Sequence, residues 1–360
     1  MKPRMRRAAF WTGLAAALAA GCATAPRPLQ PRALALQAAG VEALGRGELD
    51  RAAGHFALAL EYEPRLGEAE NGLGLVALRR GEWARAEERF HAALALDEDL
   101  AEAHLNLANT LLHRDEETLA LVEARAALAI DPGYADARLL TAELLLRVGK
   151  LDEARWELEK LCAAAPDRAD ARAANALVLA RLGRTSAAED EARRALELDA
   201  ELPAAHRARA EILRRAGDLA AAARELDFVI ASNGGGIDDR LARAILTAER
   251  GLWPEAAREL AALLEAAPRR PEVHFAAAFV ALARNEREAA LRDADAALAL
   301  RALYPEARLV RAEALLRLGR DVEMRHELRL FLAEAPPRMA AERARAERTL
   351  RARSTVLEIQ

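Results

Sequence analysis

The sequence is poor in cysteine, lysine and aromatic residues, and these shortages exclude several kinds of site. It holds two cysteines, three lysines and only 4% aromatic residues among 360 positions. No cysteines are paired at zinc-binding spacing, and neither an HExxH nor a GxSxG motif is present. A net charge of −4 leaves no basic footprint for a nucleic acid. The sequence therefore predicts no catalytic residue, cofactor, metal ligand, small-molecule substrate or nucleic-acid partner.

Clusters of β-branched and aromatic residues are also scarce, so no run of strands is expected. The hydrophobic fraction is nevertheless 52%, and much of it is alanine. Alanine favours helices and lets neighbouring helices approach closely. The composition therefore favours an all-α chain with enough apolar residues to bury a core.

Residues 1–21 have the organisation of a signal peptide. Four positive charges within the first seven residues precede an apolar run, 8–20, which is too short to span a bilayer. The run leads into LAAGC, which ends at Cys22 and resembles the lipobox of bacterial lipoproteins. The resemblance implies cleavage after Gly21 and a lipid on Cys22. An ordinary secretory signal cut nearby is the alternative.

Residues 22–32 follow as a tether whose three prolines favour an extended chain. Ala23 comes directly after the lipobox cysteine, and by resemblance to Gram-negative lipoproteins this implies sorting to the outer membrane. Without residues 1–21 the chain has 49 basic and 57 acidic residues, a net charge of −8. The remaining cysteine, Cys162, lies on an apolar helical face and is interpreted as a buried thiol.

A period of 34 residues runs through the rest of the chain without insertion or deletion. Its nine windows begin at Ala33, Gly67, Ala101, Ala135, Ala169, Pro203, Ile237, Pro271 and Pro305. We call positions within a window columns. Column 8 is always Gly or Ala, column 15 is Gly, Asn or Asp, and column 20 is Ala in every window except the last. Prolines recur at column 32, as Pro64, Pro132, Pro166, Pro268 and Pro336.

Each column has a physical role. A residue that tolerates left-handed backbone at column 15 ends a first helix, and the proline prevents a second helix from continuing. Small residues at columns 8 and 20 let the two helices approach, and larger ones such as Phe56 and Phe90 fill the remaining space. Each window is therefore a helix-turn-helix unit that must stack on its neighbours to bury its apolar face.

The period and its columns resemble those of the tetratricopeptide repeat family. The resemblance implies a right-handed α-solenoid of nine repeats over residues 33–338, followed by a capping helix and tail at 339–360. The stretch MAAERARAERTLRA fits the first helix of a tenth repeat, with Ala346 at column 8. Glycines at 234–236 replace the usual turn after the sixth window, and we interpret them as a flexible joint.

Three histidines share column 4: His104, His206 and His274. They belong to windows three, six and eight. Because stacked helices advance by about 8–10 Å each, these side chains cannot meet on one metal ion. We interpret them as packed side chains.

In the resembling family the first helices line a concave face that commonly binds peptides or helices, with columns 2, 5, 9, 12 and 13 pointing inward. The residues expected to form such a partner-binding groove are Asn71, Leu75, Leu105, Asn109, Leu112, Leu139, Glu143, Leu146, Arg207, Glu211, Arg214, Arg215, Phe275 and Phe279. The groove should be mostly apolar with a basic middle. Phe275 and Phe279, four residues apart on one helical face, are its expected anchors. Burial of these side chains between repeats is the alternative.

The sequence thus predicts a non-catalytic scaffold for protein–protein interaction. The lipid on Cys22 would attach it to the outer membrane, with the repeats in the periplasm. The expected role is to aid assembly of an envelope complex such as a pilus or a secretion system. A structural part of a polysaccharide-export complex and an adaptor that recruits cell-wall enzymes are alternatives, since a fold does not fix a function.

Overall fold

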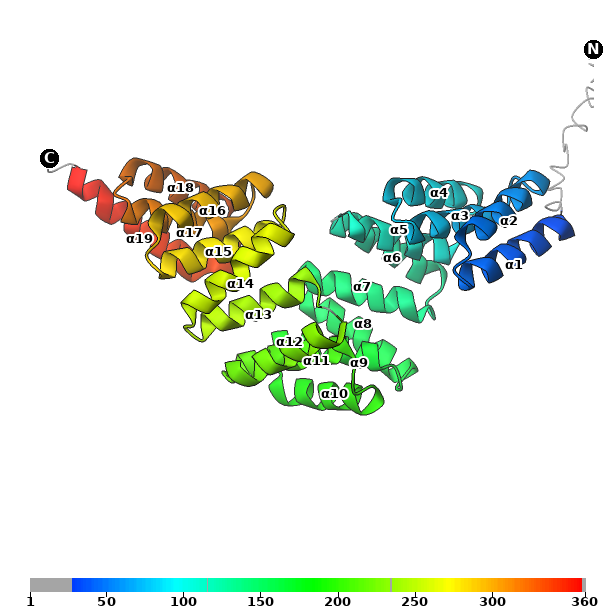
Figure 1. Cartoon of the computed structure of the whole chain (residues 1–360), viewed down its shortest axis with the longest axis horizontal. Coiled ribbons are helices and arrows are strands. Elements are labelled where there is room, and N and C mark those ends of the chain that lie inside the picture. The colour runs from blue at the N-terminus through cyan, green and yellow to red at the C-terminus, as the bar shows by residue number, and fades with distance from the viewer. Residues whose placement is uncertain (1–27, 115, 234, 358–360) are drawn as a thin grey trace, which may run out of the picture. The chain divides into compact units, whose positions relative to one another are not determined.

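The computed structural model describes residues 28–114, 116–233 and 235–357. Within these residues the chain forms 19 α-helices and one short 3-10 helix, and no strand (Figure 1). The expectation of an all-α repeat fold is confirmed. The predicted signal peptide and Cys22 lie outside the described residues. None of the helices described is long and apolar enough to cross a membrane.

The chain divides into two compact units, the first ending at Pro132 and the second beginning at Gly133. In the first unit each helix packs against the next one along the chain. Its helices are α1 (Pro31–Gly45), α2 (Leu49–Tyr62), α3 (Gly67–Arg79), α4 (Trp83–Leu96), α5 (Ala101–His113) and α6 (Glu117–Ile130).

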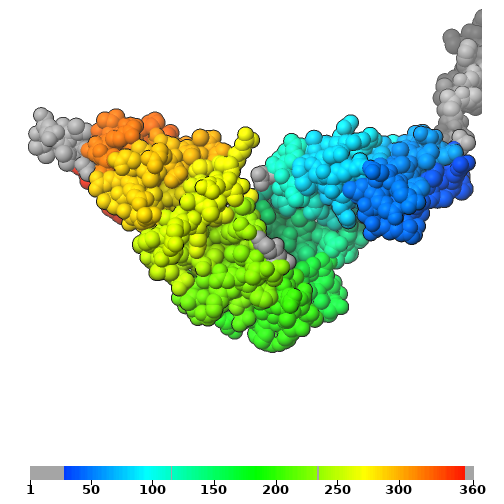
Figure 2. Space-filling model, viewed as in Figure 1, coloured from blue at the N-terminus to red at the C-terminus, as the bar shows by residue number. Residues whose placement is uncertain are grey.

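The second unit continues in the same way, with each helix packed against the next; its atoms are green to orange in Figure 2. Its helices are α7 (Ala135–Arg147), α8 (Leu151–Ala164), α9 (Ala169–Arg181), α10 (Thr185–Leu198), α11 (Pro203–Ala216), α12 (Leu219–Asn233), α13 (Ile237–Glu249), α14 (Trp253–Ala266), α15 (Pro271–Ala283), α16 (Arg287–Leu300), α17 (Pro305–Arg317), α18 (Asp321–Glu334), η1 (Pro337–Met339) and α19 (Ala340–Leu357).

The 34-residue period is visible in the helix bounds. The odd-numbered helices from α3 to α17 each begin at the first residue of a window. Column 15 has positive φ at every position that the structure describes, including Asn285 at 62°. After α3, Gly81 N–H donates to Leu78 O at 3.0 Å and Glu82 N–H donates to Ala77 O at 2.9 Å. This paired bonding is the Schellman ending that a left-handed residue allows.

The division between the units differs from the joint expected at residues 234–236. Helices α12 and α13, on either side of those glycines, pack against each other within the second unit. Arg207 on α11 also holds the start of α13, because its Nε and Nη2 donate to the two carboxylate oxygens of Asp239 at 2.6 and 2.9 Å. A bidentate pair of this kind fixes geometry as well as charge. The glycine turn is therefore bridged by side chains, and the division falls after Pro132.

Glycine at column 8 makes room for a phenylalanine of the same repeat. A Cβ added to Gly40 would lie 2.6 Å from the ring of Phe56, and one added to Gly74 would overlap the ring of Phe90. Both rings are fully buried. The expected close approach of the two helices at this column therefore takes the form of an aromatic ring lying directly on a helix backbone.

A second recurring contact, between an acidic and a basic side chain, joins the two helices in seven of the repeats. Column 4 of the first helix pairs with column 23 of the second in seven repeats: Glu70 with Arg89, His104 with Glu123, Arg138 with Glu157, Arg172 with Glu191, His206 with Glu225, His274 with Asp293, and Arg308 with Glu327. In the first of these the acid and the base have exchanged columns. We call this series the column 4–23 ladder.

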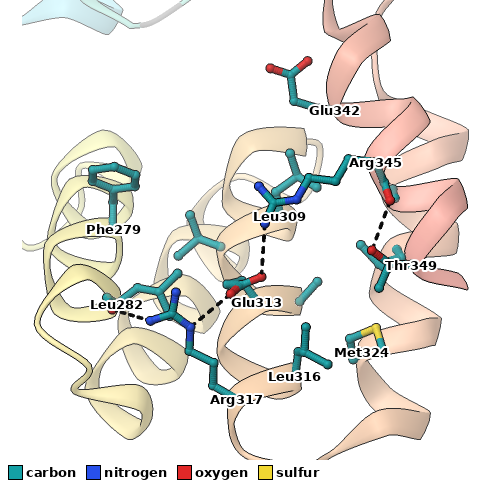
Figure 3. Close-up of a pocket in the computed structure, with 14 residues that line it drawn as sticks. Phe279, Leu282, Leu309, Glu313, Leu316, Arg317, Met324, Glu342, Arg345 and Thr349 are labelled. Carbon is teal, nitrogen blue, oxygen red and sulfur yellow. Dashed lines mark hydrogen bonds and ion pairs between the residues drawn. The ribbon is translucent and has the colours of Figure 1, made fainter. Parts of the chain in front are cut away.

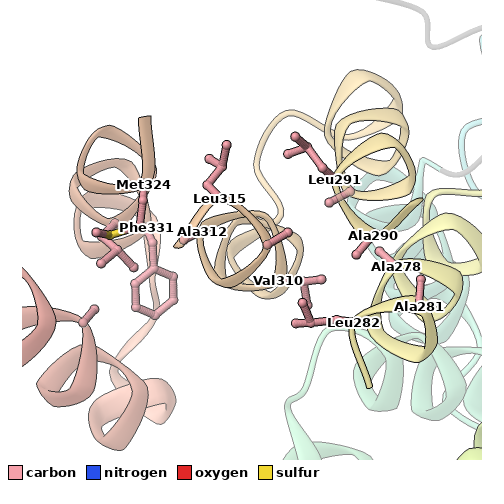
Figure 4. Packing of buried hydrophobic residues seen from close by; sticks show 14 of the residues in the cluster. Ala278, Ala281, Leu282, Ala290, Leu291, Val310, Ala312, Leu315, Met324 and Phe331 are labelled. Carbon is pink, nitrogen blue, oxygen red and sulfur yellow. The ribbon is translucent and has the colours of Figure 1, made fainter. Parts of the chain in front are cut away.

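The C-terminal end of the second unit is closed by α19. Its Ala346 is buried in a cluster with Met324 and Phe331 of α18 and with Leu315 of α17. Figure 4 shows this cluster, which extends back to Ala278 on α15. Most of the Arg and Glu side chains of α19 up to residue 352 are exposed, as a capping helix requires.

Candidate functional site

The odd-numbered helices of the second unit form a surface with three hollows, which we call the first-helix face. The α7–α13 hollow has a volume of about 790 Å³, the α13–α15 hollow about 310 Å³ and the α15–α19 hollow about 340 Å³. Ile245 lines the first and second, and Phe279 lines the second and third. These two shared residues make the hollows one continuous surface within the second unit.

The α7–α13 hollow is lined by arginines whose charges are largely balanced. Arg207 pairs with Asp239, as described above. Arg214 donates to both oxygens of Glu211, at 2.9 and 3.1 Å, and to Glu249 at 3.1 Å. The expectation of a basic middle therefore needs correction, because carboxylates contributed by α11 and α13 neutralise much of the arginine charge.

The ion pairs in this hollow also shift the pKa values of its carboxylates. The Arg207 guanidinium lowers the pKa of Asp239, although burial opposes this effect. Burial alone would raise the pKa of Glu211, but hydrogen bonds from Arg214 and Arg215 outweigh it, so the pKa is lowered. These carboxylates therefore stay ionised over the whole physiological range, and the pairs act as fixed parts of the surface.

Glu143 on α7 behaves in the opposite way. Loss of solvation raises the pKa of its carboxyl, and the nearby Arg147 only partly offsets the rise. The Glu143 side chain is exposed at the surface. Glu143 lines none of the three hollows.

The α13–α15 hollow is almost entirely apolar. The two phenylalanines expected as anchors, Phe275 and Phe279, both line it, but they are placed differently. Phe279 leaves 49% of its surface exposed. Phe275 is half-buried and packs against Tyr304, with ring centroids 5.3 Å apart. Phe279 is thus a surface residue, and Phe275 belongs partly to the core.

The α15–α19 hollow combines apolar and charged side chains. Figure 3 shows Phe279 on α15, Glu313 and Arg317 on α17, and Arg345 on α19 around it. Arg317 donates to Glu313 at 3.0 Å and to the carbonyl of Leu282 at 2.8 Å. The Arg345 guanidinium reaches to 4.0 Å from Glu313, and its side chain is 78% exposed.

The other expected groove residues lie outside the three hollows. On α7 Leu146 is buried and Leu139 is half-buried, and on α11 the exposed Arg215 donates to Glu211 at 2.7 Å. The remaining five belong to the first unit: Leu105 is buried, and Asn71, Leu75, Asn109 and Leu112 are half-buried.

Two of the first-unit asparagines make hydrogen bonds of their own. Asn71 accepts a hydrogen bond from Asn106 at 3.0 Å, and Asn109 donates to the carbonyl of Leu105 at 3.1 Å.

Several lining residues were missed by the sequence analysis although their columns contained the signal. Ile245 occupies column 9 of the seventh window, the same column as Phe279. The ninth window contributes columns 5, 9, 12 and 13 to the α15–α19 hollow, as Leu309, Glu313, Leu316 and Arg317. Columns 5, 9, 12 and 13, applied to every window, therefore predict more of this surface than the fourteen groove residues named above.

The column 4 histidines belong to the ladder. In His206, Nδ1 lies 2.7 Å from a Glu225 carboxylate oxygen and Nε2 lies 3.0 Å from the Ala200 carbonyl oxygen. His104 faces a carboxylate and a carbonyl in the same way.

The comparisons with known proteins agree with this architecture. A sequence model of the tetratricopeptide repeat family matches residues 38–87, 71–135 and 139–203. A tetratricopeptide repeat protein from Parabacteroides merdae has a similar solved structure, with 17% identity, a TM-score of 0.55, and coverage of 69% of this chain and 98% of that one. A chain of the APC/C complex Cut9–Hcn1 is also similar, with 14% identity, a TM-score of 0.56, and coverage of 78% and 55%. No protein of curated function matches the chain.

The fold is thus that of an α-solenoid built from helix-turn-helix repeats. The chain contains tetratricopeptide repeats, which the family model matches over residues 38–135 and 139–203. Proteins of this family are generally non-catalytic scaffolds for protein–protein interaction, and this is the class of function that the fold supports.

Proposed function

We propose that the chain is an outer-membrane lipoprotein that holds a protein partner on the first-helix face of its second unit and so aids assembly of an envelope complex such as a pilus or a secretion system. The observation that carries the binding face is the continuity of the three hollows through Ile245 and Phe279. Phe279 is 49% exposed and Ile245 is 40% exposed. Exposed large apolar side chains in a recessed surface are frequent anchors of protein interfaces.

The support for the membrane anchor comes from the sequence. A charged start, a short apolar run and LAAGC at Cys22 together resemble a lipobox. One acyl chain binds a membrane only weakly, whereas several make release negligible, because each buried CH₂ contributes about 0.8 kcal/mol. The envelope role follows from this location, because a scaffold on the outer membrane meets envelope proteins.

Site-specific photo-crosslinking tests the binding face. A photoreactive phenylalanine is placed at Phe279 in one variant and at the exposed Arg329 on α18 in a matched control. Irradiation of cells should give a discrete adduct from position 279 and none from position 329. Adducts of the same pattern from both positions, or from 329 alone, would contradict the first-helix face as the binding surface.

Membrane fractionation tests the anchor separately. The unmodified chain should sediment with outer membranes, and Cys22→Ser should leave a soluble or unprocessed protein. Recovery of the unmodified chain as a soluble periplasmic protein would end the lipoprotein proposal. The crosslinking result would keep its meaning in that case, since the two experiments probe different parts of the chain.

A further inference from the structure

The α13–α15 hollow differs from the rest of the first-helix face in its apolar lining and its small volume. Its large lining side chains are Ile245, Trp253, Leu260, Phe275 and Phe279. The rings of Trp253 and Phe279 lie 6.4 Å apart between centroids and are tilted by 58°. At about 310 Å³, the hollow is at the small end of the roughly 300–1,000 Å³ range of ligand sites. It has room for one large side chain and not for a whole helix.

A small residue at column 12 leaves room for this hollow. Column 12 is leucine in six of the nine windows, but it is Ala248 in α13. Ala248 is buried at the base of the hollow and has only a methyl group to fill the space that a leucine side chain takes elsewhere. The fifth window also has alanine at this column, Ala180, but only in the seventh does the alanine line the α13–α15 hollow.

A single charged residue lines this apolar space. Glu249, the last residue of α13, is at its rim. Its Oε1 accepts one hydrogen bond from Arg214, which is itself shared with Glu211. Within the described part of the chain the other carboxylate oxygen of Glu249 has no recorded partner. A second cation can therefore approach Glu249 from the open side.

We propose that this hollow receives one Phe, Trp or Leu side chain of a partner peptide, and that a Lys or Arg next to this anchor in the peptide pairs with Glu249. The inference rests on the proposed function and adds the chemistry of the partner. The apolar walls select the anchor, and the carboxylate at the rim selects the sign of the neighbouring charge. An acidic flank would instead face Glu249 without compensation.

Selection from a library of random dodecapeptides displayed on phage tests this chemistry directly on the purified chain. Selected peptides should share a large apolar residue within two positions of a Lys or Arg. Ala248→Leu introduces the residue that six other repeats have at column 12, so it fills the hollow with a side chain that the fold already accepts. It should weaken binding of the selected peptides about tenfold, because the anchor loses its pocket. Ala262→Leu, which adds a leucine at an exposed position of α14 outside the hollow, should leave binding unchanged.

Charge reversal gives a readout that damage to the fold does not produce. On Glu249→Arg, the same selection should return peptides with acidic residues beside the apolar anchor. Glu265→Gln, at an exposed position of α14, should select the same basic peptides as the unmodified chain. Melting temperatures close to that of the unmodified chain would show that both variants are folded.

The outcomes separate this inference from the proposed function. Peptides that bind equally well to Ala248→Leu and Glu249→Arg would overturn the inference, while a crosslink at position 279 would leave the proposed function in place. Saturable binding of indole alone, with no peptide selected, would overturn it in favour of a site for a small apolar molecule. No selected peptide together with no crosslink at position 279 would overturn both.

Discussion

At column 8 the choice between glycine and alanine follows the size of the residue at column 24. The two windows with glycine, Gly40 and Gly74, have phenylalanine at column 24, and the windows with alanine have alanine or leucine there. The structure supplies the reason, since the Phe56 and Phe90 rings occupy the space that a Cβ would take. The residues at columns 8 and 24 are therefore correlated because their side chains pack together. The sequence shows this correlation, and the structure gives its physical cause.

Gly74→Ala and Gly54→Ala should change stability in opposite directions. The added methyl at position 74 overlaps the Phe90 ring, and overpacking of this kind costs on the order of 1–3 kcal/mol. Gly54 lies within α2 with open space around its Cβ position, so alanine there should stabilise by about 0.5–1 kcal/mol through helix propensity. Urea denaturation measures both. Adding Phe90→Leu to Gly74→Ala should recover part of the loss, and no recovery would contradict the proposed clash.

Cys162 should react slowly with alkylating reagents in the native protein. Burial, with a further contribution from the Glu191 carboxylate, raises the pKa of the Cys162 thiol to about 11, compared with a usual value of 9.0. The thiolate is the reactive form, so labelling at pH 8 should be about a hundredfold slower than for a free thiol. The rate should rise about tenfold per pH unit up to the pKa. In a chain carrying Cys22→Ser this is the only thiol, and labelling at the same rate in native and urea-unfolded protein would exclude a buried cysteine.

At the scale of helices, the column 4–23 ladder is a set of side-chain pairs that the repeat register alone does not predict. The sequence supplied the helix starts, the left-handed turns and the small columns, because each of these depends on one position. The ladder depends on two positions 19 residues apart, and its polarity is reversed at Glu70 and Arg89. Comparison within a single column therefore identifies the histidines of column 4 but not the acidic residues of column 23 that pair with them. The same limit applied to Arg207, whose charge is balanced by Asp239 in the next repeat.

Removing one member of the ladder should cost more than removing an exposed ion pair. Arg172 contacts Glu191 at 3.0 Å and the carbonyl of Pro166 at 2.7 Å, and both charged side chains are only 14% exposed. Arg172→Ala removes the pair between the two helices and leaves the partly buried Glu191 carboxylate with only the exposed Arg194, at 2.9 Å on the same helix; this should destabilise by roughly 1–3 kcal/mol. Arg193→Ala on the exposed side of α10 removes two solvent-facing pairs and should have little effect. Equal losses in thermal unfolding would contradict a structural role for the ladder.

At the scale of the whole molecule, the repeat fold was predictable because one pattern recurs nine times, so errors at single positions average out. The binding surface was less predictable, because it depends on departures from the pattern. Ala248 opens a hollow where most windows have leucine, and Glu249 gives that hollow its charge. The division after Pro132 likewise has no counterpart in the composition, whereas the conspicuous glycines at 234–236 lie within one compact unit.

Replacing each of the two phenylalanines of α15 should have different effects, one on partner binding and the other on the stability of the fold. Phe279 is 49% exposed on the first-helix face, so Phe279→Ala should weaken capture of the partner while the melting temperature falls little. Phe275 packs against Tyr304 and against the buried cluster that continues through α17 to α19. Loss of a fully buried phenylalanine costs about 3–5 kcal/mol, and Phe275→Ala should lose a substantial part of that amount because its ring is half-buried. Thermal unfolding and binding of a selected peptide, measured on both variants, give the comparison. If Phe279→Ala is the more destabilising of the two, its ring is part of the core, and the anchor on this face must be sought at Ile245 instead.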